Sequence, residues 1–436
     1  MKILMFGWEF PPHISGGLGT ACFGLTKGLA QLDDIEVTFV VPKAWGDEDR
    51  SNVTLLGADE VPVIHEQIQF ANAKSKVEYY KLQSELIPYL GTSEFDELKS
   101  EIASEENRLT EITPDGKIVF GGDYGQNLFQ EINNYAIVAE KLAGEIDFDV
   151  IHVHDWMCFR AGMAAKRISG KPLVVHVHST EFDRSGRSVN PAICLIEKEG
   201  LQAADKIIAV SHLTRSILIG KYNINQKKII TVYNAVEPAR SGGTKTSREF
   251  TNDKVVSFLG RITAQKGPEY FVEAASLVLQ KMKNVRFVMA GKGDLLNEMK
   301  ERVASLNISE YFHFPGFVAD SEIAELFHSS DVFVMPSVSE PFGIVTLEAM
   351  QAGVPVVISN QSGVSEVVKN AIKVDFWDSR SMADAIYAIL INWEYGLRLG
   401  EKGKHEAEKL IWKNAALKVS KIYLTLQKTY DFDKHN

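Results

Sequence analysis

The sequence predicts an α/β protein of two domains, each a doubly wound parallel sheet with helices on both faces. Two observations carry this prediction. Short apolar segments that read as strands alternate with helical patterns along the chain, and this alternation is typical of parallel sheets. The length of 436 residues exceeds that of an ordinary single domain, so two domains are expected.

The apolar segments divide into two series separated by a polar stretch. That stretch runs from Glu237 to Asp253, contains a Ser-Gly-Gly sequence, and is interpreted as the linker between domains. We therefore expect a first domain over residues 1–240 and a second over residues 250–412. Strands are predicted near residues 2–6, 36–41, 149–154, 172–177, 206–210, 229–232, 255–259, 285–290, 311–314, 332–335, 355–358 and 371–374.

One segment departs from a minimal doubly wound domain. Residues 66–115 form a charged insertion with helical patches. The insertion is interpreted either as a lid or acceptor surface, or as a helical hairpin with no role in function. The tail, residues 413–436, carries apolar residues at helical spacing and is predicted to form a helix.

Composition favours an ordinary globular protein of the cytoplasm. Hydrophobic residues make up 45%, charged residues 24%, and the net charge is −10, which disfavours non-specific nucleic-acid binding. Cys22, Cys158 and Cys194 are widely spaced, so neither a disulfide framework nor a zinc cluster is expected, and a reducing compartment fits. Residues 1–10 are too short and polar for a signal peptide. No apolar run reaches the ~18 residues of a membrane span.

The most informative segment is Ser339–Met350, in which two carboxylates stand eight positions apart. It follows the apolar run Val332–Met335 and ends in good helix formers. Glu340 is therefore predicted in a strand-to-helix loop, and Glu348 about one turn inside the helix. The competing interpretation is a loop acid followed by an exposed helical glutamate.

The start of this helix is a candidate phosphate site. The backbone N–H groups of Gly343, Ile344 and Val345 lack intrahelical acceptors there and can bind phosphate oxygens. Because a helix rises ~1.5 Å per residue, Glu348 is displaced towards the position of a ribose. Glu340 falls on the other side, where a group attached to the phosphate would lie. The layout suits a sugar, a diphosphate and a nucleoside in a line.

A glycine loop follows the first strand. The strand at residues 2–6 runs into Gly16 and Gly17, and a helical pattern begins at Ala21. The two glycines permit positive φ and close backbone approach beneath a diphosphate. A dinucleotide-binding fingerprint is disfavoured because its third glycine is Cys22 in this chain. A plain turn before a helix is the alternative.

Two histidines end the strand near residues 149–154. His154 and Asp155 stand at its carboxyl end, the end that faces the ligand crevice in doubly wound sheets. His152, two residues earlier, is expected to pack or to bond locally. A zinc site built on both histidines is disfavoured, because the sequence shows no third and fourth ligand nearby.

A basic pair follows the strand near residues 255–259. Arg261 and Lys266 flank one loop, and two fixed cations can offset the charge that develops on a leaving diphosphate. The alternative is a solvated pair of surface cations. Loops containing Gly291 and Gly363 follow other predicted strands; they are interpreted as plain turns, or, by the family resemblance given below, as neighbours of a donor site.

Together these segments resemble the family 4 glycosyltransferases. The spacing of Glu340 and Glu348 is similar to the E-x7-E motif of retaining enzymes with the GT-B fold, in which two Rossmann-like domains face each other across the active-site cleft. The segment from Gly260 to Gly267 resembles the family's Gly-Arg-x4-Lys-Gly motif. The Gly-Gly-Leu loop and the His-x-His-Asp-Trp segment ending at Trp156 resemble glycogen and starch synthases.

The resemblance implies a retaining hexosyltransferase that moves glucose from a UDP- or ADP-sugar to an α-glucan acceptor. It also implies that the last helix crosses back to the first domain. The leaving diphosphate's own oxygen would take the acceptor proton. The implied catalytic residues are His154, Arg261, Lys266 and Glu340. The implied donor-binding residues are Gly16, Gly17, Gly343, Ile344, Val345 and Glu348.

Other functions remain open. Glycogen synthases often carry a non-acidic residue where Glu348 stands, and the Lys-x-Gly-Gly form of some synthases reads Ile14-Ser15-Gly16-Gly17. A family 4 transferase for surface polysaccharide or small-molecule acceptors, a GT-B epimerase and a non-catalytic sugar-binding regulator are the alternatives. An α-glucan phosphorylase would need a pyridoxal-bearing lysine and a much longer chain.

No cofactor or metal is predicted. The Asp-x-Asp candidates are Asp147-Phe148-Asp149, just before a strand, and Asp431-Phe432-Asp433 in the tail. Neither lies in a loop suited to a divalent ion, so we expect activity without one. The predicted partners are the nucleotide sugar and a glycan acceptor.

Overall fold

The computed structural model describes residues 1–14, 16–63, 111–122, 124–125, 127–186, 188–238 and 253–435. Most of the predicted insertion at 66–115 and most of the predicted linker at 237–253 lie outside the described residues.

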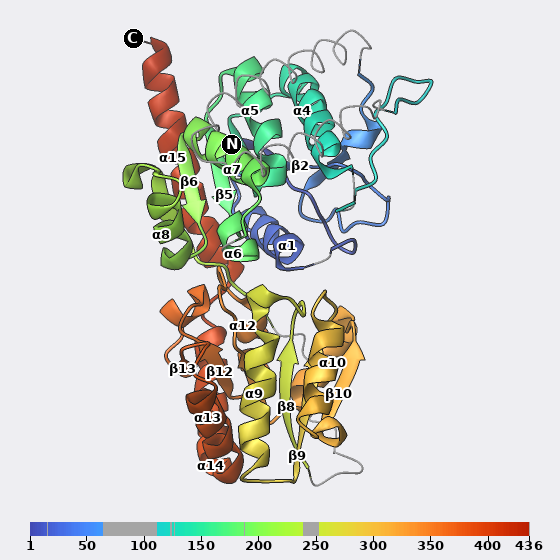
Figure 1. The fold of residues 1–436 in the computed structure, drawn as a ribbon. Helices are drawn as coiled ribbons and strands as arrows, with labels where there is room; N and C mark the ends of the chain where they lie inside the picture. The colour runs from blue at the N-terminus through green and yellow to red at the C-terminus, as the bar shows by residue number, and fades with distance from the viewer. Residues whose placement is uncertain are drawn as a thin grey trace. The chain divides into compact units, whose positions relative to one another are not determined.

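Packing divides the chain into two compact units (Figure 1). The first comprises Met1–Val177, Leu195–Ile208 and Ala416–Asn436, and the second comprises His178–Cys194 and Ala209–Ala415. We expected residues 1–240 and the tail to form the first domain, whereas His178–Cys194 and the chain from Ala209 to Ala415 group with the second unit.

The first sheet has seven strands in the described residues, in the order β3-β2-β1-β4-β5-β6-β7. The pairs β3–β2, β2–β1, β1–β4 and β4–β5 are parallel. β3 was not predicted: it is a four-residue edge strand in which two residues are buried, so its apolar signal is short. The strands are β1 Lys2–Phe6, β2 Glu36–Val41, β3 Thr54–Gly57, β4 Val150–His154, β5 Leu173–Val177, β6 Lys206–Ala209 and β7 Ile229–Thr231.

Strands β4 and β5 are buried along their whole length, as expected for central parallel strands covered on both faces. The imidazoles of His152 and His154 therefore lie inside the protein. The helices of this part of the chain are α1 Gly17–Ala30, α4 Leu128–Glu145, α5 Trp156–Ser169, α6 Glu181–Ser185, α7 Pro191–Ala203 and α8 His212–Gly220, with 3-10 turns η1 Ala58–Glu60 and η2 Gln226–Lys228.

The second sheet has six strands in the described residues, in the order β10-β9-β8-β11-β12-β13. All of its neighbouring strands are parallel. The strands are β8 Lys254–Leu259, β9 Val285–Ala290, β10 Phe312–Gly316, β11 Val332–Met335, β12 Val356–Ser359 and β13 Ile372–Val374. Each lies within two residues of its predicted position.

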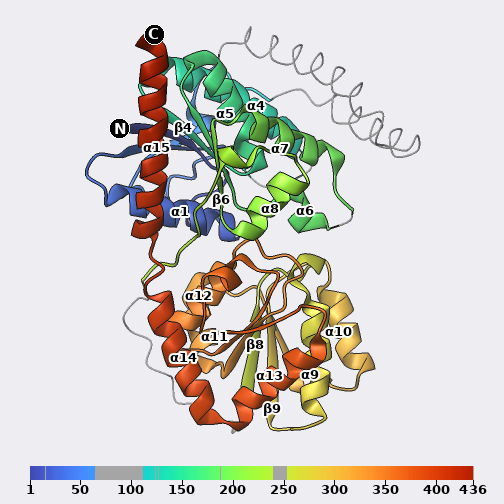
Figure 2. The same cartoon turned by 90° about the vertical axis from the view of Figure 1, so that its left-hand side faces the viewer.

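Helices flank this second sheet (Figures 1 and 2). They are α9 Pro268–Leu279, α10 Leu296–Ser305, α11 Asp320–Ser329, α12 Ile344–Gln351, α13 Ser379–Ile391 and α14 Trp393–Ala407, with 3-10 turns η3 Ala264–Lys266, η4 Ser309–Tyr311 and η5 Gly363–Glu366. Apolar side chains of α9 and α13 pack with those of β8, β9 and β11 into one buried core. This core holds the carboxyl ends of β8 and β11 and thus the loops that follow them.

The predicted C-terminal helix is α15, Trp412–His435. Its residues from Ala416 onward group with the first unit, where the helix runs beside the sheet (Figure 2). Val419, Ile422, Tyr423 and Leu426 are buried, at the i, i+3, i+4 and i+7 spacing of one helix face.

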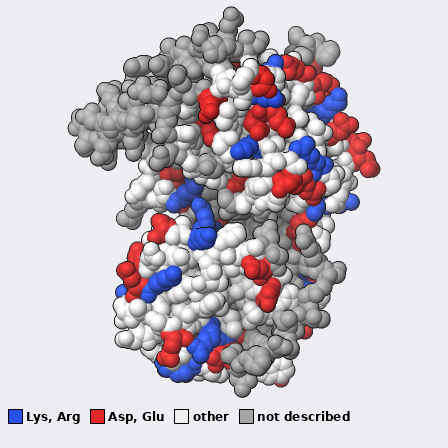
Figure 3. Space-filling view, turned by 90° about the vertical axis from the view of Figure 1, so that its right-hand side faces the viewer, with Lys and Arg blue, Asp and Glu red and all other residues white. Residues whose placement is uncertain are grey.

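Acidic and basic side chains are interspersed on the face shown in Figure 3. Among the described residues, no helix is both long and apolar enough to span a bilayer.

Candidate active site

The loop between β11 and α12 presents a helix N-terminus. Gly343 caps α12 in the left-handed conformation, with a φ of 101°, which glycine adopts at little cost. A Cβ atom at this position would lie 3.1 Å from Glu340 Cγ and from Met335. Ile344 and Val345 form the first turn of α12, where helical geometry leaves N–H groups available to an anion. The predicted phosphate-binding turn therefore has the backbone it requires.

Glu340 lies in the same loop and is 5% exposed. Its Oε2 atom accepts hydrogen bonds from Lys266 Nζ at 2.5 Å and from Ser337 Oγ at 3.1 Å. Lys266 and Glu340 are 74 positions apart in the sequence. The structure thus joins two predicted site residues in one ion pair. Ser337 is a contact that the sequence prediction did not include.

Arg261 is held at the same loop through Gln265. The Arg261 guanidinium donates to Gln265 Oε1 at 3.2 Å, and Gln265 Nε2 donates to the carbonyl of Ser339 at 3.1 Å. The backbone N–H of Val338 donates to the Gln265 carbonyl at 2.9 Å. Gln265 therefore connects the predicted cation to the residue before Glu340. Sequence analysis could have identified Gln265 as a site residue from its position between Arg261 and Lys266.

Two glycines let the neighbouring loops approach closely. A Cβ atom on Gly267, which has a φ of 62°, would lie 2.3 Å from the carbonyl oxygen of Pro336. A Cβ atom on Gly291 would lie 1.8 Å from the carbonyl oxygen of Gly260. Both are contacts that no side chain tolerates, so the loop carrying Arg261 is packed between the loops after β9 and β11.

Gly363 supports the Glu340 loop from a third side. Its N–H donates to the Glu340 carbonyl at 2.8 Å, and a Cβ atom here would lie 2.1 Å from the carbonyl oxygen of Pro341. This packing contact accounts for a glycine at residue 363. Glu348 is half-buried on α12, one turn after Ile344, as the sequence predicted.

His154 lies in the first unit, at the carboxyl end of β4, and is fully buried. Its ring stacks on that of His152, with centroids 4.5 Å apart and planes 21° apart. The ring of His176 lies 5.2 Å from that of His154, because β4 and β5 pair His154 with His176 in parallel register. His152 packs inside the protein, as expected, but its partners are not local: Nε2 lies 3.2 Å from His176 Nδ1, and Nδ1 bonds the hydroxyl of Tyr423.

The sequence showed no third ligand beside the two histidines, but the fold brings a third imidazole, that of His176, close to them. Nitrogen atoms of His152, His154 and His176 lie within 4.8 Å of one another. The predicted strand at residues 172–177 contained His176, but only the strand register places it beside His154. Both ring nitrogens of His152 engage in hydrogen bonds, which favours a hydrogen-bonded cluster over a metal site.

Gly16 and Gly17 lie at the start of α1, which begins at Gly17 rather than at Ala21. Neither adopts the positive φ that we expected. Gly16 is extended, with a φ of 178°, and Gly17 does not have a left-handed φ. A Cβ atom on either would meet no described atom within 4 Å. The open space beside both residues is compatible with close approach of a ligand.

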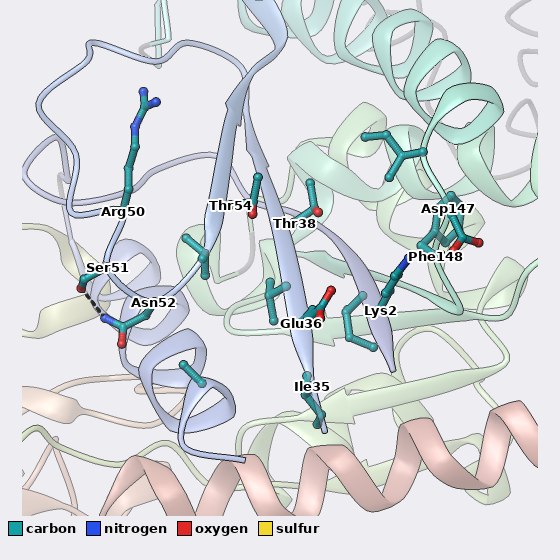
Figure 4. Close-up of a pocket in the computed structure, with 15 residues that line it drawn as sticks. Lys2, Ile35, Glu36, Thr38, Arg50, Ser51, Asn52, Thr54, Asp147 and Phe148 are labelled. Carbon is teal, nitrogen blue, oxygen red and sulfur yellow. Dashed lines mark hydrogen bonds and ion pairs between the residues drawn. The ribbon is translucent and has the colours of Figure 1, made fainter. Parts of the chain in front are cut away.

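A cavity of about 580 Å³ lies elsewhere (Figure 4). It is lined by residues at the amino ends of strands, including Lys2, Glu36, Thr54 and Asp147, and by none of the predicted site residues. Asp147 accepts from Lys2 Nζ at 2.9 Å, and Asp149 accepts from the Lys2 backbone N–H at 2.8 Å. These carboxylates of the Asp-x-Asp sequence thus anchor β1.

Two family models match this chain. Residues 244–406 match the model of group 1 glycosyl transferases, and residues 105–240 match the model of Glycosyltransferase Family 4. The chain belongs to the family 4 glycosyltransferases. The predicted resemblance is confirmed, and membership of this family makes the protein a transferase of sugars.

Relatives align with the transferase along nearly its whole length. An uncharacterized glycosyltransferase of Methanocaldococcus jannaschii is 28% identical over 97% of this chain and 98% of its own. A glycogen synthase of Mycobacterium tuberculosis is 22% identical over 98% and 95%. The Anabaena HepE structure in complex with UDP and glucose superposes with a TM-score of 0.65 at 17% identity, covering 98% of this chain and all of the other. The predicted GT-B fold is thereby confirmed.

Proposed function

We propose that this transferase moves a glucosyl group from UDP- or ADP-glucose to an α-glucan acceptor, with retention of the anomeric configuration. The observation that carries the proposal is the convergence of Arg261, Lys266 and Glu340 at the N-terminus of α12. Two cations, a buried carboxylate and a helix start together match the needs of a sugar diphosphate.

The cations and the helix start serve the diphosphate. Lys266 has three N–H donors, so it can keep its bond to Glu340 and still bind a phosphate oxygen. Arg261 can fork onto two oxygens. The amides of Ile344 and Val345 add donors at the positive end of the helix. All of these groups are held in place before reaction, and pre-positioned charge of this kind is an effective form of transition-state stabilisation.

The reaction needs no further base on this proposal. The acceptor hydroxyl oxygen bonds to the anomeric carbon as the bond from that carbon to the diphosphate oxygen breaks. The acceptor proton passes to the departing diphosphate oxygen, and attack occurs on the face that the diphosphate leaves. Glu340 orients the sugar, Glu348 binds the ribose hydroxyls, and His154 donates to a sugar hydroxyl.

The glucosyl donor and α-glucan acceptor rest on the sequence. The Gly-Gly-Leu loop and the segment ending in His154-Asp155-Trp156 are similar to those of glycogen and starch synthases, and a glycogen synthase is among the relatives. The same site chemistry would serve a different acceptor, so the acceptor is the part of the proposal that needs direct measurement.

The test is release of nucleoside diphosphate from a panel of nucleotide sugars, each with and without glycogen or malto-oligosaccharide. Release from UDP- or ADP-glucose that depends on these acceptors supports the proposal. Release only with other sugars or acceptors would overturn the α-glucan assignment. Acceptor-independent release with an isomerised sugar would indicate an epimerase.

A matched pair of variants links the activity to the site. Glu340→Gln removes the charge of the buried carboxylate, whereas Glu394→Gln makes the same change at an exposed position on α14. We expect a loss of about 10²–10³-fold in kcat for the first and an unchanged rate for the second. A sugar-binding regulator without catalysis would release no nucleotide in any of these proteins.

A further inference from the structure

Tyr423 is fully buried, although it belongs to the C-terminal helix α15. Its hydroxyl bonds Nδ1 of His152, 271 positions earlier in the chain. The two rings meet edge to face, with centroids 5.7 Å apart. Both residues belong to the first unit, so the contact lies within one compact body.

The direction of this hydrogen bond follows from burial. Burial raises the pKa of Tyr423 well above its usual value, so the phenol keeps its proton. If the imidazole donated, that buried phenolic proton would need another acceptor, and leaving it without one is costly. The hydroxyl therefore donates, and Nδ1 of His152 carries no proton. The remaining proton of neutral His152 lies on Nε2 and points to His176 Nδ1, 3.2 Å away.

Both hydrogen-bonded histidines contact the ring of His154. His152 stacks on His154 at 4.5 Å, and His176 lies at 5.2 Å. His152 and His176 thus contact the His154 ring from its own strand and from β5. A rotation of the His152 ring would remove part of that support, and Tyr423 and His176 are the hydrogen-bond partners that oppose this rotation.

We propose that Tyr423 is a positioning residue for the transferase reaction, which holds His154 in its reactive orientation through His152 and His176. The inference rests on the proposed role of His154 towards the donor sugar. It gives the C-terminal helix a specific chemical contribution: one hydroxyl that sets the tautomer of a buried imidazole. Packing of α15 alone would need only an apolar ring at this position.

The matched experiment compares Tyr423→Phe with Tyr135→Phe. Tyr135 is also fully buried in the first unit, and its hydroxyl donates to the Val40 carbonyl at 2.7 Å, away from the histidines. Both variants lose a buried, hydrogen-bonded hydroxyl; that of Tyr135 also lies 3.1 Å from the Gly7 carbonyl oxygen. Steady-state kinetics at 25 °C should show kcat lowered roughly ten- to a hundredfold for Tyr423→Phe, with the donor KM within about twofold, and an unchanged kcat for Tyr135→Phe.

The tautomer is measured directly on the wild-type protein with nitrogen-15-labelled histidine. Nuclear magnetic resonance should show His152 protonated on Nε2 and accepting at Nδ1. A protonated Nδ1 would overturn the inference without recourse to any variant, so the test survives if Tyr423→Phe fails to fold.

The variant His154→Ala distinguishes a failure of this inference from a failure of the proposed function. Loss of activity in His154→Ala with unchanged kcat in Tyr423→Phe would overturn the inference alone. Full activity in His154→Ala would overturn the role of His154 itself. Equal losses of kcat in Tyr423→Phe and Tyr135→Phe would show that the loss comes from a less stable fold rather than from the orientation of His154. That result would overturn the inference as well.

Discussion

The ammonium nitrogen of Lys266 lies 2.5 Å from Oε2 of Glu340. The two side chains are 20% and 7% exposed, so solvent screens the pair only in part. Lys266 ends the turn after β8 and Glu340 lies in the loop after β11, and these strands are neighbours in the second sheet. Neighbouring parallel strands thus bring a predicted phosphate ligand and a predicted sugar ligand into one pair.

The first prediction is that Lys266 and Glu340 act as a unit. Lys266→Met and Glu340→Gln should each lower kcat strongly, and the double variant should be little worse than either single one. We expect a coupling energy of about 1–3 kcal/mol in the transition state. The measurement is kcat/KM for the four proteins of the cycle. Additive losses would show that the two residues contribute independently.

The second prediction concerns Gly343. Gly343→Ala places a Cβ atom at a φ of 101° and 3.1 Å from Glu340, whereas Gly353→Ala, just beyond the other end of α12, has a φ of 77° and open space. Each should cost about 1–2 kcal/mol of stability from backbone strain. Only Gly343→Ala should also weaken UDP binding, measured by titration calorimetry. Equal UDP affinity in the two variants would contradict the phosphate role of this turn.

The third prediction concerns Gln265, which the sequence analysis did not single out. Gln265→Ala removes the bridge from the Arg261 guanidinium to the Ser339 carbonyl. Arg261 then loses a fixed orientation, so we expect kcat/KM for the donor to fall roughly tenfold. Arg261→Ala should lose more, and the double variant should match Arg261→Ala. A further loss in the double variant would show that Gln265 acts other than through Arg261.

The fourth prediction is a pH dependence of stability. Burial lowers the pKa of His178 to about 3, whereas the unfolded chain binds this proton near pH 6.5. The contribution of His178 is therefore fully present above pH 6.5 and is lost as the pH falls towards 3.

Between pH 7 and 5, the free energy of unfolding of the wild-type protein should fall by up to about 2 kcal/mol more than that of His178→Gln. Urea unfolding at both pH values measures the difference. Parallel losses in the two proteins would show that His178 is not responsible.

The fifth prediction is that a chelator leaves activity intact. The predicted site contains cations and helix amides that offset diphosphate charge, the task a divalent ion performs in other enzymes. Activity should be unchanged after treatment with ethylenediaminetetraacetate and dialysis. If added Zn²⁺ restored the lost activity, the metal would be assigned to His152, His154 and His176. If Mg²⁺ restored it, a divalent ion would perform the role proposed for Lys266 and Arg261.

Much of the fold can be predicted from the sequence because buried parallel strands are short apolar runs. Strong local signals mark β8, β11 and the glycine before α12. Arg261 and Glu340 could be predicted as site residues because they follow these two strands. β3 was missed because an edge strand of four residues contains too few apolar positions to stand out.

The contacts that complete the site depend on tertiary register. His176 belongs to a predicted strand, but its place beside His154 follows from the pairing of β4 with β5. Tyr423 lies in a predicted helix whose local sequence gives no sign that one hydroxyl reaches a histidine 271 positions away. Gln265 is different, because it stands between two predicted cations and could have been examined with them.

The most direct test of the central claim follows the anomeric proton of the transferred sugar. Wild-type protein, donor and acceptor are mixed, and proton nuclear magnetic resonance records the product as it forms. An α-linked product that appears together with nucleoside diphosphate, and is absent with Glu340→Gln, is the predicted result. A β-linked product, or an α-linked product formed by Glu340→Gln at the wild-type rate, would contradict the account.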